Sequence, residues 1–262
     1  MNTKDITSAT SNILLIGDSG THKTYFLGSV PDLYVFDFDG GMAILRSKSV
    51  EYDTFKEVPK GVKVTPNMTK TMGLYDYGEA WPAFFKKLQA TGEAIDKGQG
   101  PKALAFDSLT FLSMIAVGNI LKLTGHDMPH QGTWGAHHEY FKRIFGQVTA
   151  WPVRVIATVH IQRAENDLTT VTEKLPLLAG KMAGMIGAFF DEVYFCESEK
   201  NAKGEQKFTL KSKADLQLKQ AKSRWGVPDG TETSWEAVSK YFGELPKPQV
   251  GGSIPTPTPG KE

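Results

Sequence analysis

The chain has 262 residues, of which 40% are hydrophobic and 23% charged, so it can bury one substantial core and is not disordered over most of its length. Its 30 basic and 29 acidic side chains give a formal net charge of +1, which excludes a global electrostatic attraction to nucleic acid or anionic lipid. The only cysteine, Cys196, excludes an internal disulfide, and the sequence lacks a membrane-length apolar stretch and a secretory signal, so we expect a cytoplasmic protein without a membrane partner.

Short apolar segments alternate with longer segments of helical period. The predicted strands cover residues 13–16, 33–37, 103–106, 153–159 and 192–196, with shorter ones at 207–211 and 216–221. The predicted helices cover residues 23–29, 78–96, 109–123, 137–150, 182–190 and 235–242. This order predicts an α/β fold with a mostly parallel central sheet flanked by helices on both faces. We expect one domain over residues 12–245, a flexible N-terminus at 1–11 and a flexible Pro/Gly-rich tail at 246–262.

The first predicted strand leads into a glycine-containing loop that ends in Lys-Thr and precedes a helix. The loop consists of Gly17, Asp18, Ser19, Gly20, Thr21, His22, Lys23 and Thr24. This order directs backbone N–H groups towards one point, where a polyphosphate fits. In such loops the lysine ammonium contacts the outer phosphates, and the adjacent hydroxyl binds the Mg²⁺ that accompanies a nucleoside triphosphate. The alternative is a glycine-rich turn followed by Lys-Thr without function.

His22 stands where the common pattern G-x-x-x-x-G-K-[ST] has its second glycine. A side chain at this position either crowds the bound phosphate or points away and leaves the backbone cradle intact. The sequence leaves both possibilities open. We therefore expect nucleotide binding rather than efficient hydrolysis.

Acidic residues follow two further predicted strands. Asp107 follows residues 103–106, where a carboxylate lies beside the phosphate loop and holds Mg²⁺; alternatively, Asp107 is a helix N-cap. Asp37 ends the second predicted strand and Asp39 follows it, at an edge where a carboxylate can accept the proton of an attacking water. Asp39 is the first candidate for this base and Asp37 the second, against the alternative of an ordinary strand-to-loop junction.

Polar residues also follow the strand at 153–159. His160 or Gln162 could contact the γ-phosphate and report its presence to the next segment, although a lone histidine is as often structural. The segment at 163–181 has no strong periodicity, so we expect a long, mobile loop.

Several motifs occur in an order that resembles the RecA-like recombination ATPases encoded by phages, compact relatives of RecA and of the bacterial RadA protein. The motifs cover residues 17–24, 35–41, 106–110, 158–160, 177–181, 190–193 and 222–226. The last motif, Lys222-Ser223-Arg224-Trp225-Gly226, is similar to the Lys-Asn-Arg-Phe-Gly motif of RadA proteins. The resemblance covers about residues 12–226 and implies a RecA-like P-loop NTPase fold.

This resemblance implies an ATPase that acts on single-stranded DNA in homologous recombination, annealing or repair. It implies self-association into a filament or ring, with a nucleotide site shared between subunits, and an annealing or single-strand-binding protein of the phage as a candidate partner. By position, Lys23, Thr24 and Asp107 would bind phosphates and Mg²⁺, Asp39 would replace the catalytic glutamate, and His160 would sense the γ-phosphate. Lys222 and Arg224 would reach the neighbour's nucleotide, whereas without the resemblance they indicate a solvated basic turn.

Two departures from the family pattern predict weak, assembly-dependent turnover. His22 replaces a glycine, and Asp39 is one methylene shorter than the usual glutamate. A nucleotide-binding regulator with little or no hydrolysis and a hexameric helicase motor are the alternative functions. A small-molecule kinase ranks last, because arginine is sparse between Lys102 and Arg143, where such an enzyme would carry an arginine-rich lid.

Two segments are candidates for DNA contact. The first covers residues 122–143 and contains His126, His130, Trp134, His137, His138, Tyr140, Phe141, Lys142 and Arg143, which offer stacking surfaces and cations. The second covers residues 163–181, placed like the DNA loop of RecA-like proteins. His126 and His130 also suggest zinc, but no cysteine or nearby acid completes a convincing ligand set.

Overall fold

The computed structural model describes residues 11–56, 80–126, 128–165, 171–201 and 203–242. The strands are β1 (Ile13–Gly17), β2 (Leu33–Asp37), β3 (Glu51–Thr54), β4 (Ala103–Asp107), β5 (Arg154–Val159), β6 (Ile161–Glu165), β7 (Thr172–Pro176), β8 (Glu192–Lys200), β9 (Gln206–Lys211) and β10 (Thr231–Glu232). The helices are α1 (Lys23–Leu27), η2 (Gly41–Leu45), α2 (Ala80–Asp96), α3 (Leu109–Thr124), α4 (Gln131–Val148), α5 (Met182–Met185), η3 (Ile186–Phe189) and α6 (Trp235–Ser239). Apart from Ser11, the terminal segments predicted to be flexible lie outside the described residues.

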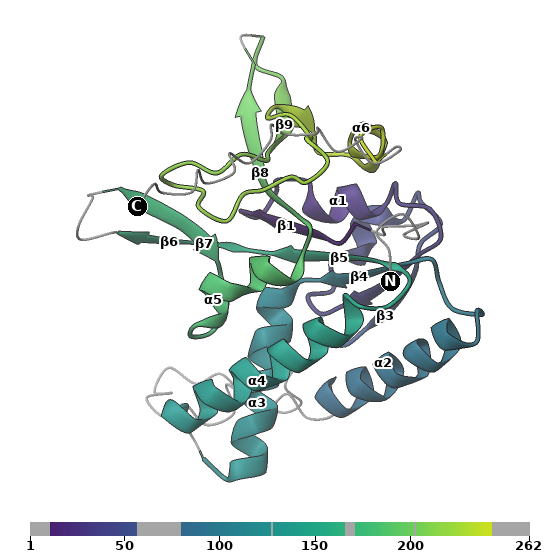
Figure 1. The fold of residues 1–262 in the computed structure, drawn as a ribbon, viewed down its shortest axis with the longest axis vertical. Helices are drawn as coiled ribbons and strands as arrows, with labels where there is room; N and C mark the ends of the chain where they lie inside the picture. Colours follow the sequence, from purple (N-terminus) through teal and green to yellow (C-terminus); the bar gives the residue numbers. More distant parts are fainter. Residues whose placement is uncertain (1–10, 57–79, 127, 166–170, 202, 243–262) are drawn as a thin grey trace, which may run out of the picture.

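Within the described residues, eight strands form one sheet in the order β10-β9-β8-β1-β5-β4-β2-β3 (Figure 1). The strands from β8 to β3 in this order pair in parallel, whereas β9 and β10 extend the β8 edge as antiparallel strands. The register aligns Gly17 with Cys196 and Asp37 with Asp107. The carboxyl ends of the parallel strands therefore meet at one edge of the sheet, where ligands bind in open α/β folds.

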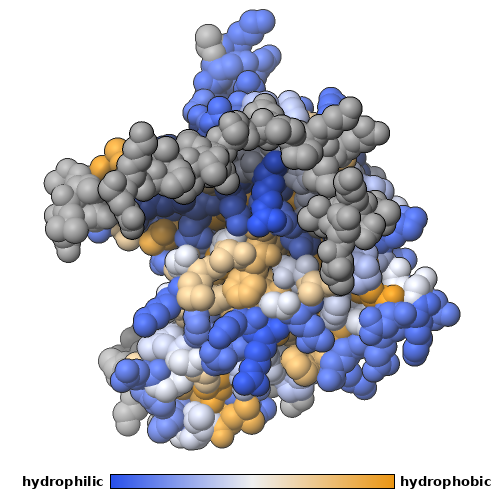
Figure 2. Space-filling model, viewed as in Figure 1, coloured by the Kyte–Doolittle hydropathy of each residue, from blue (hydrophilic) through white to orange (hydrophobic). Residues whose placement is uncertain are grey.

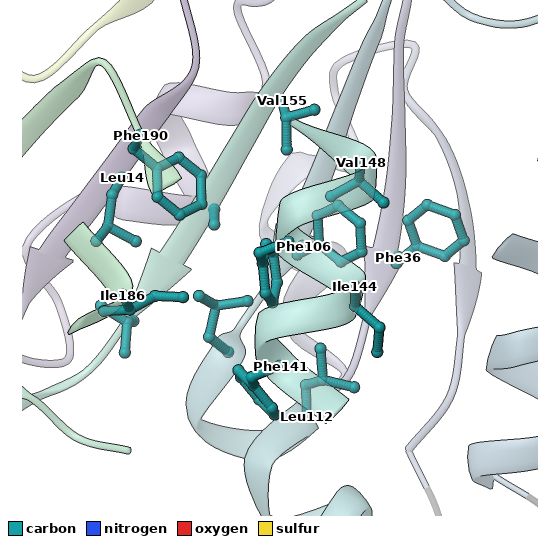
Figure 3. Close-up of a cluster of buried hydrophobic side chains, with 14 of the residues drawn as sticks. Leu14, Phe36, Phe106, Leu112, Phe141, Ile144, Val148, Val155, Ile186 and Phe190 are labelled. Carbon is teal, nitrogen blue, oxygen red and sulfur yellow. The ribbon is translucent and has the colours of Figure 1, made fainter. Parts of the chain in front are cut away.

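Both faces of the sheet are buried, because alternate residues of each strand point to opposite sides. Leu14 and Ile16 of β1 belong to a core cluster with residues of α2, α3 and α4. Ile13 and Leu15 belong to a second cluster with residues of α1, η2 and α6. Figure 3 shows part of the first cluster, where side chains of α4 lie beside those of β2 and β4. The predicted arrangement, a mostly parallel sheet with helices on both faces, is confirmed.

The five main predicted strands are present, but several edge elements differ from the prediction. β3 was not predicted, because its sequence Glu-Tyr-Asp-Thr is polar. This strand lies at the edge of the sheet and is largely exposed. The strand predicted at 216–221 is wrong, since this segment has no strand and Leu216 is 69% exposed. Instead, Asp215 Oδ1 accepts hydrogen bonds from the backbone N–H groups of Gln217 and Leu218, both at 2.7 Å, which favours a turn.

The helix predicted to begin at His137 begins six residues earlier, at Gln131. Its N-cap is His130, whose Nδ1 accepts a hydrogen bond from the backbone N–H of Gly132 at 3.0 Å. The backbone N–H of His130 in turn donates to Thr133 Oγ1 at 3.3 Å. Histidine is not among the favoured N-cap residues, so this helix start carries only a weak signal in the sequence.

Two hairpins extend from the sheet. β6 and β7 pair in antiparallel fashion directly after β5, so residues 163–165 and 172–176 of the segment predicted as a long, mobile loop belong to strands. β8 and β9 form the other hairpin, whose outer end is hydrophilic in the surface view (Figure 2). Among the helices that the structure describes, none has the length and hydropathy needed to cross a membrane.

Candidate functional site

The loop after β1 folds tightly around its own lysine. Lys23 Nζ donates hydrogen bonds to the carbonyl oxygens of Gly17 and Asp18 at 2.9 and 2.7 Å, and Thr21 Oγ1 donates to the Asp18 carbonyl at 2.8 Å. A Cβ atom at position 17 would lie 2.6 Å from Thr21 Oγ1 and 2.8 Å from the Cys196 carbonyl oxygen. Only glycine fits at this position.

The Lys23 side chain is buried, with 6% of the residue exposed. Burial lowers the pKa of its ammonium group, while the neighbouring carboxylates of Asp107, Asp18 and Asp39 act in the opposite direction. A desolvated ammonium group that donates to neutral carbonyl oxygens can form stronger, charge-assisted hydrogen bonds with an anion. An incoming polyphosphate therefore competes with the loop carbonyls for this ammonium group.

His22 adopts the left-handed backbone conformation, with φ 65° and ψ 18°. This explains why glycine is common at the equivalent place in the motif, since glycine adopts positive φ without a steric penalty and histidine tolerates it better than most residues. The imidazole stacks on Phe208 of β9 at a centroid distance of 3.3 Å and also contacts Tyr25 at 4.9 Å. The imidazole ring is held against β9. The backbone at His22 has the left-handed conformation that a glycine adopts easily.

We expect His22→Ala to be less stable than His22→Gly by about 1 kcal/mol, because both variants lose the contact with Phe208 but only alanine has a Cβ strained at positive φ. Urea denaturation of the two variants measures this difference in the free energy of unfolding. Equal stabilities, or a more stable alanine variant, would contradict the backbone explanation for this position.

Asp107 lies at the carboxyl end of β4, beside Thr24 and Thr158. Thr24 Oγ1 donates a hydrogen bond to Asp107 Oδ2 at 2.8 Å, and Thr158 Oγ1 donates to Asp107 Oδ1. Burial raises the pKa of the Asp107 carboxyl group, and the hydrogen bonds from both threonines and the charge of Lys23 oppose this rise. Oxygen donors from Thr24 and Asp107 therefore meet next to Lys23, as binding of Mg²⁺ requires.

The described residues contain no group of three or more histidine, cysteine, aspartate or glutamate side chains that could hold a metal ion. The pair Thr24 and Asp107 instead fits Mg²⁺ that arrives with a nucleotide, because this ion uses one or two protein oxygens together with phosphate oxygens and water.

The two acids after β2 have different environments. Asp37 is buried, and its Oδ1 accepts hydrogen bonds from the backbone N–H groups of Gly40 and Gly41 at 2.8 and 3.2 Å, while Oδ2 accepts from Thr54 Oγ1 at 3.0 Å. These bonds make Asp37 a structural residue of the turn. Asp39 lines the cavity described below and accepts a hydrogen bond from the Gly41 N–H at 2.9 Å.

Burial, together with the charges of Asp107 and Asp37, raises the pKa of Asp39 to about 6. This carboxyl group is therefore poised to take up a proton near neutral pH, which suits a general base. Of the two candidate bases, the environment of Asp39 fits this role better.

The raised pKa gives a stability prediction. Ionised Asp39 costs folding free energy, because its pKa is higher in the folded protein than in the unfolded chain; this cost is present at pH 8 and shrinks as the pH falls through about 6 towards 4. We expect Asp39→Asn to raise the free energy of unfolding at pH 8 by about 1–2 kcal/mol, after allowance for solvent screening.

Urea denaturation at pH 8 and pH 4.5 measures the change, and Asp37→Asn is the matched control. Asparagine at position 37 weakens hydrogen bonds to an ionised acceptor, so this control should lose stability at pH 8. A destabilised Asp39→Asn variant at pH 8 would contradict the assigned environment.

These groups surround one cavity of about 450 Å³ at the carboxyl edge of the sheet. Its walls are formed by Ser19, Gly20, Thr21, His22, Lys23, Thr24, Tyr25, Asp39, Gly41, Ile44, Asp107, Phe111 and His160. His160 follows β5, and its backbone N–H donates to Thr110 Oγ1 at 3.0 Å. Burial and the nearby Lys23 charge lower the pKa of its imidazole, so a neutral ring faces the cavity.

Lys222 and Arg224 lie at the opposite end of the strands. Lys222 pairs with Val193 near the start of β8, which the register aligns with Leu14 of β1. Gly17, where the phosphate loop begins, is three residues farther along β1, about 10 Å at the usual rise per residue. The structure therefore does not bring Lys222 and Arg224 to the cavity of their own chain. Arg224 Nη1 instead contacts Asp191 Oδ1 at 2.6 Å, with 67% of its side chain exposed.

The first candidate DNA-contact segment is not one loop. Most of it belongs to the end of α3 and to α4, and two of its candidate stacking residues are part of the interior. His137 is fully buried, with Nε2 2.8 Å from Ser113 Oγ, and Phe141 is fully buried in the core. Neither can stack on a base in this fold.

The zinc interpretation of His126 and His130 finds no support in the described residues. The two rings lie 4.3 Å apart, but no third ligand joins them. His130 Nδ1 already accepts the hydrogen bond that caps α4. The position of His130 is explained by its role as the N-cap of α4.

Other features of the site were not predicted. Thr158 shares Asp107 with Thr24, Ile44 of η2 lines the cavity at 61% exposure, and Phe208 supports His22. Tyr25, next to Thr24, could have been considered from its position alone. Ile44 and Phe208 carry no local motif, because only the fold brings them to the phosphate loop.

The chain matches the model of a known protein family. A family model described as an AAA domain matches residues 9–225, more than half of the chain. Among solved structures, the chain is similar to a prototypical ATPase from the type III secretion system of pathogenic bacteria, with 13% sequence identity and a TM-score of 0.42. This similarity covers 72% of the present chain and 52% of that protein, so the chain spans about half its length. No curated protein sequence matches.

Proposed function

Because the chain belongs to the AAA domain family, we propose that it binds ATP with Mg²⁺ in the cavity beside Lys23 and hydrolyses it. Family membership together with the mostly parallel sheet supports a RecA-like P-loop fold with a general ATPase activity. The observation that carries the proposal is the convergence of Lys23, Thr24, Asp39, Asp107 and His160 on one cavity. These residues come from four separate strands or their connections, and only the fold unites them.

Each residue has a role that its surroundings support. Lys23 would exchange the carbonyls of Gly17 and Asp18 for the outer phosphates. Thr24 and Asp107 would hold Mg²⁺, which supplies charge neutralisation for the β- and γ-phosphates when bound. Asp39 would orient the attacking water and accept its proton, and His160 would contact the γ-phosphate.

The site is proposed to be completed by a second copy of the chain. Lys222 and Arg224 are remote from the cavity of their own chain, yet the guanidinium of Arg224 is largely exposed. A cation supplied by a neighbouring subunit stabilises the charge that develops during phosphoryl transfer. Self-association into a filament or ring would therefore control hydrolysis.

The substrate context follows from the order of motifs. The similarity of the segment from Lys222 to Gly226 with the RadA motif supports action on single-stranded DNA in homologous recombination, annealing or repair, as in phage-encoded RecA-like ATPases. A phage annealing or single-strand-binding protein is the proposed partner, and a cytoplasmic location is part of the same proposal. The β6–β7 hairpin is the better candidate for DNA contact, because the other segment is mostly helix.

A regulator that binds nucleotide without useful hydrolysis is the second candidate. It is favoured by the stacking of His22 on Phe208, which connects the phosphate loop to β9 and could transmit nucleotide binding to the edge of the sheet. Phosphate release, measured with and without single-stranded DNA, separates the two functions. A helicase motor would in addition separate DNA strands in an unwinding assay.

The proposed function is tested by measuring particle size with a non-hydrolysable ATP analogue, with and without a single-stranded oligonucleotide. We expect the analogue to cause self-association and the oligonucleotide to join the larger particle. A protein that stays monomeric under every condition and does not retain the oligonucleotide would contradict the recombination role.

A further inference from the structure

The β6–β7 hairpin places an arginine on the phosphate loop. Arg163 of β6 contacts Asp18 with both terminal nitrogens: Nη2 lies 2.6 Å from Oδ2 and Nη1 lies 3.4 Å from Oδ1. Asp18 is the second residue of the phosphate loop, and it is separated from Arg163 by 145 positions in the chain. The contact therefore joins two segments that follow the neighbouring strands β1 and β5 and that sequence motifs do not connect.

The hairpin presents a second cation on the same face. Arg163 pairs directly with Lys174 across the two strands, so the two side chains lie on one face of the hairpin. Like charges in this arrangement repel each other. Lys174 Nζ contacts Glu197 Oε1 of β8 at 3.2 Å, and each cation thus meets its own acid at the edge of the main sheet.

Asp18 adds a negative charge to the phosphate-binding loop, beside rather than within the lining of the cavity. Asp18 belongs to the same short loop as Lys23, the residue proposed to bind the phosphates. Its backbone carbonyl oxygen accepts a hydrogen bond from Lys23 Nζ at 2.7 Å. Its charge also acts on Lys23 and on His160. A negative charge beside the cavity opposes the binding of a polyphosphate anion, and in this structure Arg163 pairs with it, with 54% of the Arg163 side chain and 51% of the Asp18 side chain exposed.

We propose that Arg163 is a positioning residue for nucleotide binding, which neutralises Asp18 and holds the hairpin against the phosphate loop. This inference rests on the proposed binding of ATP. Arg163 should therefore affect the affinity for nucleotide only when residue 18 is negatively charged. An arginine that contacted the phosphates directly would affect the affinity for nucleotide with any residue at position 18.

The experiment is a titration of the full chain with a fluorescent ATP analogue and Mg²⁺. We expect Arg163→Gln to weaken binding about three- to tenfold at low salt, where a unit charge near the site acts over this range. Asp18→Asn should restore the affinity of Arg163→Gln to within about twofold of the wild type, and the loss should shrink towards about twofold at 0.5 M salt. Arg163→Lys, which keeps the charge, should recover most of the affinity.

Lys174→Gln is the matched control, because it removes the neighbouring cation of the same hairpin but leaves Asp18 and Arg163 paired. It should bind the analogue like the wild type. An unchanged affinity of Arg163→Gln, a failure of Asp18→Asn to restore binding, or an equal loss in Lys174→Gln would overturn the inference. A wild-type chain that does not bind the analogue would instead overturn the proposed function.

Discussion

Replacement of Lys23 by alanine is expected to abolish measurable binding of ATP with Mg²⁺. The ammonium group is buried and points into the loop carbonyls of Gly17 and Asp18, where the outer phosphates would take their place. Loss of two charge-assisted hydrogen bonds should weaken binding about 100-fold or more. Calorimetric titration of the variant with ATP measures this loss.

Lys86→Ala is the control, because Lys86 is an exposed lysine on α2 and its removal changes the net charge equally. Circular dichroism should show that both variants keep the secondary structure of the wild type. Binding by Lys23→Ala at nearly the wild-type affinity would contradict the role of the loop.

Replacement of Arg224 by alanine is expected to leave ATP binding within about twofold of the wild type and to lower turnover per chain about 1,000-fold, the effect of removing a cation supplied in trans. The side chain is 67% exposed and far from the cavity of its own chain, so binding should survive. Steady-state phosphate release at saturating ATP measures turnover. Asp191→Asn is the control, since it removes the partner of Arg224 but keeps the guanidinium group.

Mixing the two inactive variants tests the shared site directly. In a mixture of Lys23→Ala and Arg224→Ala chains, some interfaces combine an intact Lys23 from one chain with an intact Arg224 from the other. Such a mixture should recover part of the wild-type turnover, whereas Arg224→Ala alone keeps about one-thousandth of it and Lys23→Ala alone does not bind ATP measurably. Full activity of Arg224→Ala alone, or no recovery in the mixture, would contradict a site shared between subunits.

The central strands could be predicted because they are buried on both faces. Leu33–Asp37 and Ala103–Asp107 each begin with four apolar residues before the terminal aspartate, and such runs indicate interior parallel strands. The edge elements gave a weaker signal. β3 is polar and exposed, and the β6–β7 hairpin mixes charged and apolar residues, so propensity and periodicity did not distinguish them from loops.

The candidate site was predictable where a motif stands at the end of a strand. Lys23, Thr24 and Asp107 were assigned from spacing, and the structure brings them together. Asp39 was ranked before Asp37 from the sequence, but the physical difference between them lies in the hydrogen bonds that Asp37 accepts from Gly40, Gly41 and Thr54, which the sequence does not show. The contacts of His22 with Phe208 and of Asp18 with Arg163 depend on tertiary structure, which no local pattern reveals.

Equilibrium titration of the wild-type chain with ATP, with and without Mg²⁺, is the most direct test of the central claim that the cavity beside Lys23 is a nucleotide site. We expect saturable binding of one ATP per chain, strengthened by Mg²⁺ through Thr24 and Asp107 and competed by ADP. An absence of saturable binding in the presence of Mg²⁺ would contradict the claim.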